Sequence, residues 1–195
     1  MLANSTHHHP VVLLPPGAPV LDLTRPQSSP AETPWDAGWS IGRYDEDRAI
    51  YDQPLFGGVR TVHLGIDLGG PAGTAVHAPT AGVVEHAGYN PADGDYGHVI
   101  VTRHQLDERP VWVLFGHLSA QSITHSPVGR VLVPGDVIGW LGEHHENGGW
   151  FPHVHVQLCW ERPETHDMPG AVARSDRAAG LALYPDPRRL IGPVY

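Results

Sequence analysis

Three segments of the sequence contain residue types that bind metal ions. In chain order they are His63-Leu-Gly-Ile-Asp67, Phe115-Gly-His117-Leu118 and His153-Val-His155. Imidazole nitrogens and carboxylate oxygens are ligands that zinc prefers, and a catalytic zinc usually takes three protein ligands and leaves a fourth position for water. Together the segments predict a catalytic metal centre.

The third segment predicts two histidines on one face of a strand. Apolar and polar residues alternate from Val154 to Leu158, which is typical of a half-buried strand. Residues two apart in a strand project to the same face, so His153 and His155 are expected to point into one space.

The first segment is not expected to be helical. Gly65 and the pair Gly69-Gly70 oppose a helix, so the offset between His63 and Asp67 predicts an extended or bent segment. The chain holds 15 histidines, and any one of them could be incidental. The combination of the three segments, in this order, favours a shared site.

The elements that must position these residues are predicted to be strands. Gly (23) and Pro (20) are frequent, and they separate short β-branched or aromatic runs, as in antiparallel sheets. The predicted strands are Val59–Val62, Ala81–Glu85, His98–Thr102, Val111–Phe115, Val131–Val133, Val137–Trp140 and Val154–Trp160. The best helix candidate is Ala171–Leu183. The expected class is all-β, mainly antiparallel, with few short helices.

The motifs around these histidines resemble the lysostaphin-type metallopeptidases. After His63–Asp67, the residues that carry the resemblance are Leu68-Gly-Gly-Pro-Ala-Gly-Thr74, Ala78-Pro79, Gly82-Val-Val84, Tyr96-Gly97, Phe115-Gly-His-Leu-Ser119, Pro134-Gly-Asp-Val-Ile-Gly139 and Pro152-His-Val-His155. They follow the order of that family from about Trp35 to the C-terminus.

The resemblance implies a fold and a set of functional residues. The fold would be that of a lysostaphin-type peptidase, similar to a barrel-sandwich hybrid, with sheets that form a groove. One Zn²⁺ would be held by His63, Asp67 and His155, and His117 and His153 would be catalytic. The implied activity is zinc-dependent hydrolysis of a peptide bond, in peptidoglycan-derived (muropeptide) or Gly-rich peptides.

A narrower similarity concerns the version of this domain that is embedded between a kinase-like phosphotransferase domain and a class III aminotransferase. It rests on Ile41–Arg48, Glu146–Trp150 and Tyr184–Pro187. The chain departs from the common peptidase pattern at Gln157, where Glu often stands, and at Glu143–Phe151, which replaces a Ser/Thr/Gly-rich loop. These departures leave the substrate open, and a small amide is one alternative.

Composition excludes several function classes. The net charge is −9 and all 12 cationic residues are arginine, so a nucleic-acid partner is not expected, because phosphate binding needs a clustered basic face. Without lysine, P-loop, Schiff-base and lipoyl-carrier chemistry are excluded. Cys159 is the only cysteine, so no intrachain disulfide can form.

The chain is expected to hold a Pro-rich N-terminal tail, residues 1–34, and one metallopeptidase-like domain, residues 35–195. No apolar run approaches the 18 residues of a membrane span, and no signal peptide is recognisable. The expected location is therefore the cytoplasm.

Two rival interpretations are weighed. A cupin-like oxygenase also carries a His-X-His strand, but Glu161 lies too far along and the partner motifs lie upstream. A zinc-binding module without peptidase activity, acting as a binding or regulatory protein, is the second. Retention of all five site residues favours the enzyme.

Overall fold

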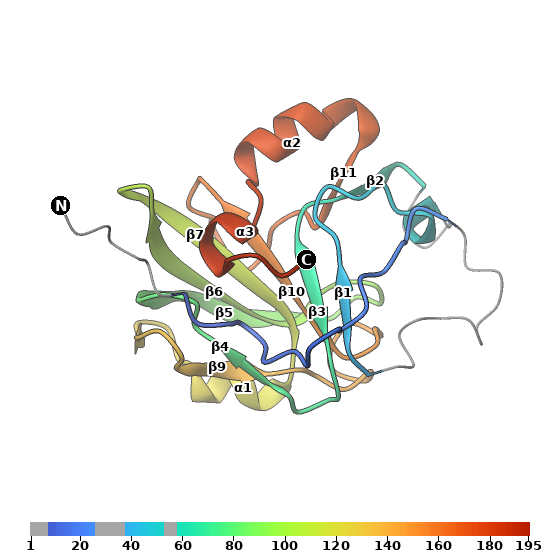
Figure 1. The fold of residues 1–195 in the computed structure, drawn as a ribbon. Helices are drawn as coiled ribbons and strands as arrows, with labels where there is room; N and C mark the ends of the chain where they lie inside the picture. The colour runs from blue at the N-terminus through green and yellow to red at the C-terminus, as the bar shows by residue number, and fades with distance from the viewer. Residues whose placement is uncertain (1–7, 26–37, 53–57) are drawn as a thin grey trace.

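The computed structural model describes residues 8–25, 38–52 and 58–195. Its main element is a seven-stranded antiparallel sheet with the order β1-β3-β10-β7-β6-β5-β8 (Figure 1). These strands are β1 (Ser40–Gly42), β3 (Ile66–Gly69), β5 (Gly82–Asn90), β6 (Gly97–Leu106), β7 (Arg109–Leu118), β8 (Val131–Leu132) and β10 (His153–Cys159). The mainly antiparallel β class predicted from the sequence is confirmed.

Two small sheets flank the main one. One pairs β2 (Arg60–His63) with β11 (Ala171–Ala173), and the other pairs β4 (Ala75–His77) with β9 (Val137–Trp140). The described helices are short: α1 (Ala120–His125), α2 (Arg177–Leu183), α3 (Arg188–Ile191) and the 3₁₀ turns η3 (Ala49–Asp52) and η5 (Arg174–Asp176).

Each of the seven predicted strands overlaps a strand of the structure, but the predicted helix Ala171–Leu183 is wrong in its first half. Ala171–Ala173 form β11, which pairs with β2, and helix α2 begins only at Arg177. Pairing with β2 overrides the helix propensity of the alanines, because ladder hydrogen bonds and packing outweigh a propensity of a few tenths of a kcal/mol.

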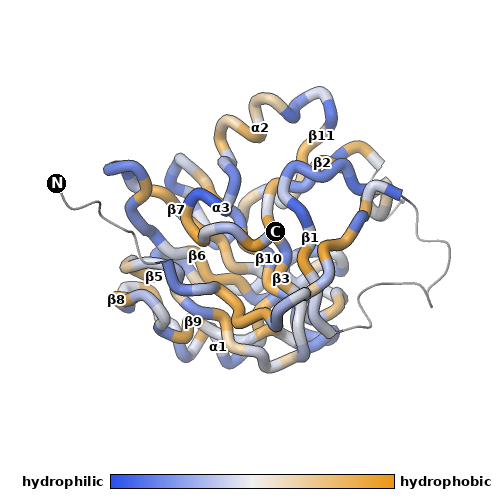
Figure 2. The backbone as a smooth tube through the Cα atoms, in the orientation of Figure 1, coloured by the Kyte–Doolittle hydropathy of each residue, from blue (hydrophilic) through white to orange (hydrophobic). Residues whose placement is uncertain are grey.

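The central strands are buried on both faces, and the alternation of β10 assigns each face a role. Val154, Val156 and Leu158 enter the larger hydrophobic cluster, which also contains Phe115 of β7. His153, His155 and Gln157 occupy the alternate positions and therefore point to the opposite face. Figure 2 shows the apolar centre and the more polar outer loops.

Residues 8–25 lie against the domain rather than apart from it. Val11, Val12, Leu21 and Leu23 are at most 3% exposed, and Val20 forms a parallel bridge with Ile41 of β1. The expected boundary between residues 34 and 35 lies outside the described residues.

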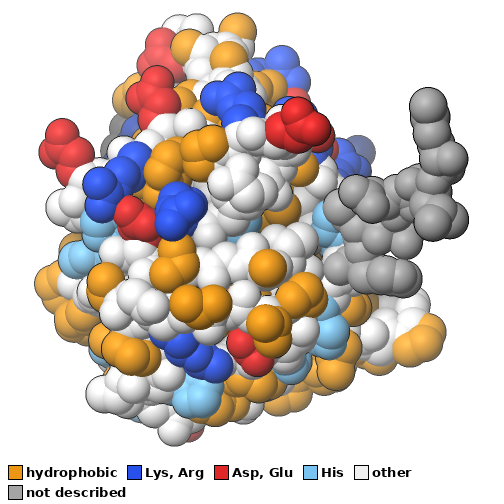
Figure 3. All heavy atoms as spheres, turned by 90° about the vertical axis from the view of Figure 1, so that its left-hand side faces the viewer, with side chains coloured by type: hydrophobic (Ala, Val, Ile, Leu, Met, Phe, Trp, Pro, Cys, Tyr) orange, Lys and Arg blue, Asp and Glu red, His pale blue; other side chains and the backbone are white. Residues whose placement is uncertain are grey.

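The surface is mixed in charge. On the face drawn in Figure 3, arginine side chains are interspersed with aspartate and glutamate, and exposed ion pairs such as Arg189–Asp107 and Arg174–Asp47 join cations to anions. None of the helices in the described part of the chain has the length and hydrophobicity that crossing a bilayer requires.

Candidate metal centre

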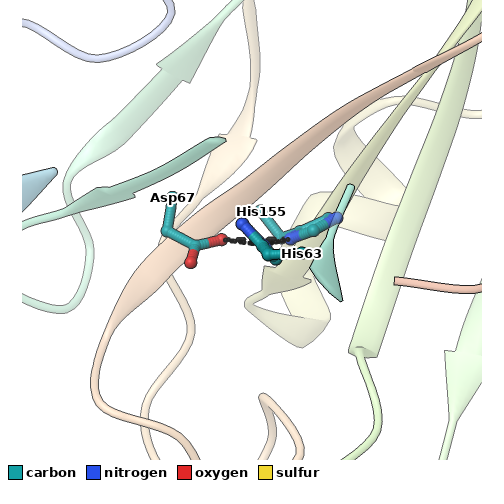
Figure 4. A group of neighbouring side chains, drawn as sticks. All are labelled: His63, Asp67 and His155. Atoms are coloured by element: carbon teal, nitrogen blue, oxygen red, sulfur yellow. Dashed lines mark hydrogen bonds and ion pairs between the residues drawn. The ribbon is translucent and has the colours of Figure 1, made fainter. Parts of the chain in front are cut away.

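His63, Asp67 and His155 converge although 92 residues separate the first from the last. β2 ends at His63, the chain bends at Leu64-Gly65, and β3 then carries Asp67. β10 pairs with β3 so that His155 stands directly opposite Asp67. Figure 4 shows the three side chains pointing toward one another, and all three are buried.

The distances between the three candidate ligand atoms fit a zinc ion. His63 Nε2 lies 3.0 Å from His155 Nδ1, and Asp67 Oδ1 lies 3.3 Å from His63 Nε2 and 3.0 Å from His155 Nδ1. Ligands about 2.0–2.1 Å from a tetrahedral zinc lie roughly 3.3–3.4 Å apart. The observed triangle is therefore close to the one that zinc needs.

Hydrogen bonds fix the tautomer of both imidazoles. The Arg43 carbonyl can only accept, so His63 Nδ1 donates to it at 2.8 Å. Gln157 Nε2 donates to the Pro169 carbonyl, which turns Gln157 Oε1 toward His155, and His155 Nε2 donates to that oxygen at 2.9 Å. In the neutral rings, His63 Nε2 and His155 Nδ1 therefore present lone pairs to the same point.

The charge states support the same conclusion. Burial, with the charge of Arg48, lowers the pKa of His63 to about 4, so this ring is neutral near pH 7. Burial alone would raise the pKa of Asp67, but the charge of the buried Arg48 guanidinium holds this pKa well below its usual range. Two lone pairs and a carboxylate thus meet in a buried space, and a cation is the group that satisfies all three.

Gly65 makes room for His155. A Cβ at this position would lie 2.4 Å from His155 Cε1 and 2.6 Å from Nε2, which real side chains do not tolerate. The glycine between His63 and Asp67 is therefore required by the approach of a ring from another strand.

His117 and His153 lie beside the three candidate ligands. Their ring centroids are 4.4 Å apart, and His153 Nε2 is 3.9 Å from Asp67 Oδ1. Burial is the largest cause that lowers the pKa of each ring. For His117, the neighbouring His153 and His155 lower the pKa further. The structure thus brings together all five residues that the sequence singled out.

The Glu143–Phe151 loop orients both of these histidines. His117 Nδ1 donates to the Asn147 carbonyl at 2.8 Å, and His153 Nδ1 donates to the Phe151 carbonyl at 2.7 Å. The Asn147 side chain holds the loop through Gly142 and Trp150. Both rings are therefore held with a proton on Nδ1 and with Nε2 available as a proton acceptor when neutral.

His117 has an uncommon backbone conformation. It lies in the left-handed region, with φ 61°, at a β-bulge: Ile100 pairs with Phe115 and His98 with Leu118, so Gly116 and His117 stand opposite the single residue Val99. Bulges re-aim side chains at the ends of sheets, and this one turns His117 toward the site.

A cavity of about 760 Å³ opens onto this site. Its lining includes four of the site residues, Asp67, His117, His153 and His155, together with Arg48, Tyr51, Tyr96, Trp150, Arg60, Asp95 and Asp167. Two aromatic residues, Tyr96 and Trp150, are among the residues that line the cavity.

Sequence reasoning missed the residues that support the site. Arg48, 2% exposed, forms an ion pair with Asp67, and the Arg43 carbonyl and Asn147 orient His63 and His117. Gln157 carried a signal, since it shares the strand face of His153 and His155. For Arg43, Arg48 and Asn147, the only signal in the sequence was the similarity of their segments to the embedded version of the domain.

Residues 61–167, more than half of the 195, match peptidase family M23. No curated protein matches the chain. Among solved structures, the chain is similar to the catalytic domain of the prophage-encoded M23 protein EnpA of Enterococcus faecalis (22% identity, 55% of this chain and 75% of that one, TM-score 0.41).

The chain is also similar to the catalytic domain of the antimicrobial peptidase lysostaphin of Staphylococcus simulans (22% identity, 61% and 79% of the two chains, TM-score 0.42). A zinc-containing peptidase of Vibrio cholerae is 17% identical over 77% of this chain, with a TM-score of 0.47. The match spans only 36% of that longer protein.

Proposed function

The chain belongs to peptidase family M23, a family of metallopeptidases, and we propose that it is a zinc-dependent peptidase whose ion is held by His63, Asp67 and His155. The observation that carries the proposal is the convergence of two imidazole lone pairs and one carboxylate oxygen, 3.0–3.3 Å apart, in a buried space beside a cavity.

Zinc in this site would supply Lewis acidity toward the scissile carbonyl and lower the pKa of bound water to about 7. The residues of the chain divide the remaining work. His63 and His155 keep their ring protons on the nitrogens that face Arg43 and Gln157, and Asp67 contributes the one negative charge.

His153 and His117 transfer protons in this proposal. Each keeps a proton on Nδ1, so each can accept one at Nε2. His153, the nearer to Asp67, orients the attacking water and accepts its proton. His117, when it also carries a proton on Nε2, donates a hydrogen bond to the developing oxyanion and then gives that proton to the leaving amine. The proton that His153 has accepted from water passes to the neighbouring His117 ring and restores it. Their lowered pKa values make both imidazolium ions readily deprotonated acids, which favours donation to that amine.

For the substrate, we propose a peptide derived from peptidoglycan or rich in glycine. Family membership supports peptidoglycan peptides, and a cavity of about 760 Å³ can enclose several residues of an extended chain. Gly94 and Gly170 are among the lining residues, and as glycines they place no side chain in the cavity.

We also propose that the chain is most similar to the version embedded between phosphotransferase and aminotransferase domains. Two of the segments that suggest this support the site directly, since the Arg43 carbonyl orients His63 and the Asn147 carbonyl orients His117. The first and third segments are joined, because the Tyr44 hydroxyl donates to the Tyr184 carbonyl. Because such a domain would act beside an aminotransferase, small amides are included among the substrates tested.

The test combines metal analysis with turnover. Purified protein is analysed for zinc by mass spectrometry and incubated with muropeptides, oligoglycine and small amides. We expect one zinc ion per chain and hydrolysis of a wall peptide or oligoglycine. His153→Ala should lose turnover and keep zinc, and His145→Ala, an exposed histidine of the loop, should keep both.

Each other outcome has a defined meaning. Zinc without hydrolysis of any substrate in the panel would support the alternative, a zinc-binding module that acts by binding or regulation. Hydrolysis of small amides alone would replace the peptide substrate. Absence of zinc from the folded protein, with no binding on addition, would refute the metal centre.

A further inference from the structure

The two oxygens of Asp67 face different partners. Oδ1 lies 3.0 Å from His155 Nδ1 and 3.3 Å from His63 Nε2. Oδ2 instead lies 2.7 Å from Arg48 Nη1 in a buried ion pair. Only one oxygen of the carboxylate is therefore directed at the candidate metal position.

Arg48 is held in place from several sides. Its side chain is 2% exposed. Its Nε donates to Glu46 Oε2 at 3.2 Å, and its Nη1 also donates to the Tyr51 hydroxyl at 3.0 Å. Glu46 is in turn fixed because its Oε1 accepts from the Leu23 amide at 3.2 Å. The guanidinium thus bridges two buried carboxylates and cannot turn away from Asp67 without leaving charges unpaired.

The backbone next to this ion pair leaves it just enough space. Gly42 of β1 stands opposite Asp67 of β3. A Cβ on Gly42 would lie 2.7 Å from Arg48 Nη2 and 2.8 Å from Asp67 Oδ2. Both Gly42 and Arg48 precede residues 61–167, which match the family, so this arrangement is a feature that the family match does not assign.

The ion pair has a consequence for the metal. An aspartate can bind a cation through one oxygen or through both, and the second oxygen would occupy the position that a catalytic zinc keeps for water. A hydrogen-bonded cation on Oδ2 prevents that mode. It also opposes metal binding by Coulomb repulsion, so its presence does not serve metal affinity.

Resting on the zinc peptidase function proposed above, we propose that Arg48 is a positioning residue that restricts Asp67 to one metal-binding oxygen and thereby keeps a coordination position open for water and substrate.

The test uses cobalt, whose visible absorption is stronger in four-coordinate than in five-coordinate sites. Replacing Arg48 alone would leave the buried Glu46 carboxylate with only the longer, 3.7 Å ion pair to the partly exposed Arg43, so the test variant is E46Q/R48M. The matched control is E46Q, which keeps the ion pair between Arg48 and Asp67. Folding is checked for every protein by circular dichroism and thermal unfolding.

We expect E46Q to have the cobalt spectrum of the unaltered protein. In E46Q/R48M the absorption per cobalt ion should fall, and kcat of the zinc form should fall about 10–100-fold with little change in KM. Metal affinity should be no weaker than in E46Q, because a neighbouring cation has been removed.

If E46Q/R48M has the same cobalt spectrum and the same kcat as E46Q, the proposal is overturned. So would a loss of metal affinity with an unchanged spectrum, since Arg48 would then only hold the fold. If the double variant does not fold, R48K decides: its single ammonium cannot reach Asp67, Glu46 and Tyr51 together. Part of the cobalt absorption should be lost, and an unchanged spectrum overturns the proposal. Failure of the unaltered protein to bind metal would instead refute the zinc site itself.

Discussion

His155 of β10 lies directly opposite Asp67 of β3, and His155 Nδ1 is 3.0 Å from Asp67 Oδ1. A directly opposite cross-strand pair places the two side chains on the same face of the sheet, with Cβ atoms about 4.5–5.5 Å apart. Two of the three candidate ligands are therefore set by strand register, and a slip of one residue would move His155 to the other face.

The first prediction concerns the ligands. His155→Ala should lose zinc and turnover together, because two remaining ligands hold zinc far more weakly than three. Zinc per chain is measured after dialysis against metal-free buffer. His125→Ala, which removes an exposed histidine of helix α1, is the control and should retain its zinc. Full zinc occupancy in His155→Ala would contradict the assignment.

The second prediction concerns His117. Asparagine tolerates the left-handed backbone conformation better than most residues, so His117→Asn should fold normally. Because proton transfer at this position is lost, kcat should fall about 10²–10⁴-fold, with zinc still bound. Single-turnover kinetics and zinc analysis of the same sample check this. Loss of zinc would show instead that His117 acts as a ligand.

The third prediction concerns Gly65. Gly65→Ala would drive a methyl group into the His155 ring, so zinc affinity and stability should both fall, the latter by about 1–3 kcal/mol. Gly129→Ala has open space but a φ of 88°, and it should lose about 1 kcal/mol while binding zinc normally. Urea unfolding of the metal-free proteins, with zinc titrations, separates the two effects.

The fourth prediction concerns Gln157, whose Oε1 accepts a hydrogen bond from His155 Nε2. Gln157→Leu removes the acceptor and should weaken zinc binding about 10–100-fold. Gln157→Glu keeps an acceptor oxygen and should bind zinc at least as tightly as the unaltered protein. Competition with a chromophoric chelator measures both constants, and equal affinity of the two variants would argue against the role given to Gln157.

The fifth prediction concerns acid stability. Burial lowers the pKa of His104 to about 4 from 6.5. The unfolded chain therefore binds a proton that the folded chain does not between these values, and stability should fall as the pH falls from 6.5 toward 4. Between pH 7.5 and 5 this residue should account for a loss of about 2 kcal/mol.

His104→Gln tests this in β6, away from the metal centre. Whatever its stability at pH 7.5, the variant should lose about 2 kcal/mol less than the unaltered protein on acidification to pH 5. Urea unfolding is followed at both pH values with a chelator present, so that metal release does not contribute. Parallel stability curves for the two proteins would exclude His104 as the cause.

Much of the fold could be predicted from the sequence because its strands are marked locally. Alternation around His155 predicted β10 and the face that its histidines share, and Gly and Pro punctuation predicted the neighbouring strands. The helix over Ala171–Leu183 failed where a distant partner, β2, captured Ala171–Ala173. The local sequence pattern cannot predict this pairing, because it depends on which distant strand the tertiary fold places next to Ala171–Ala173.

The sequence by itself determined which side chains could hold and serve a metal: His63, Asp67, His117, His153 and His155 are of the right type, and spacing along each strand directs them. Only the tertiary structure decided what surrounds them. Arg48 meets Asp67 and the Asn147 carbonyl meets His117 across 19 and 30 residues. These contacts depend on strand order, register and loop path, which are set by burial of the whole chain and not by any local stretch of it.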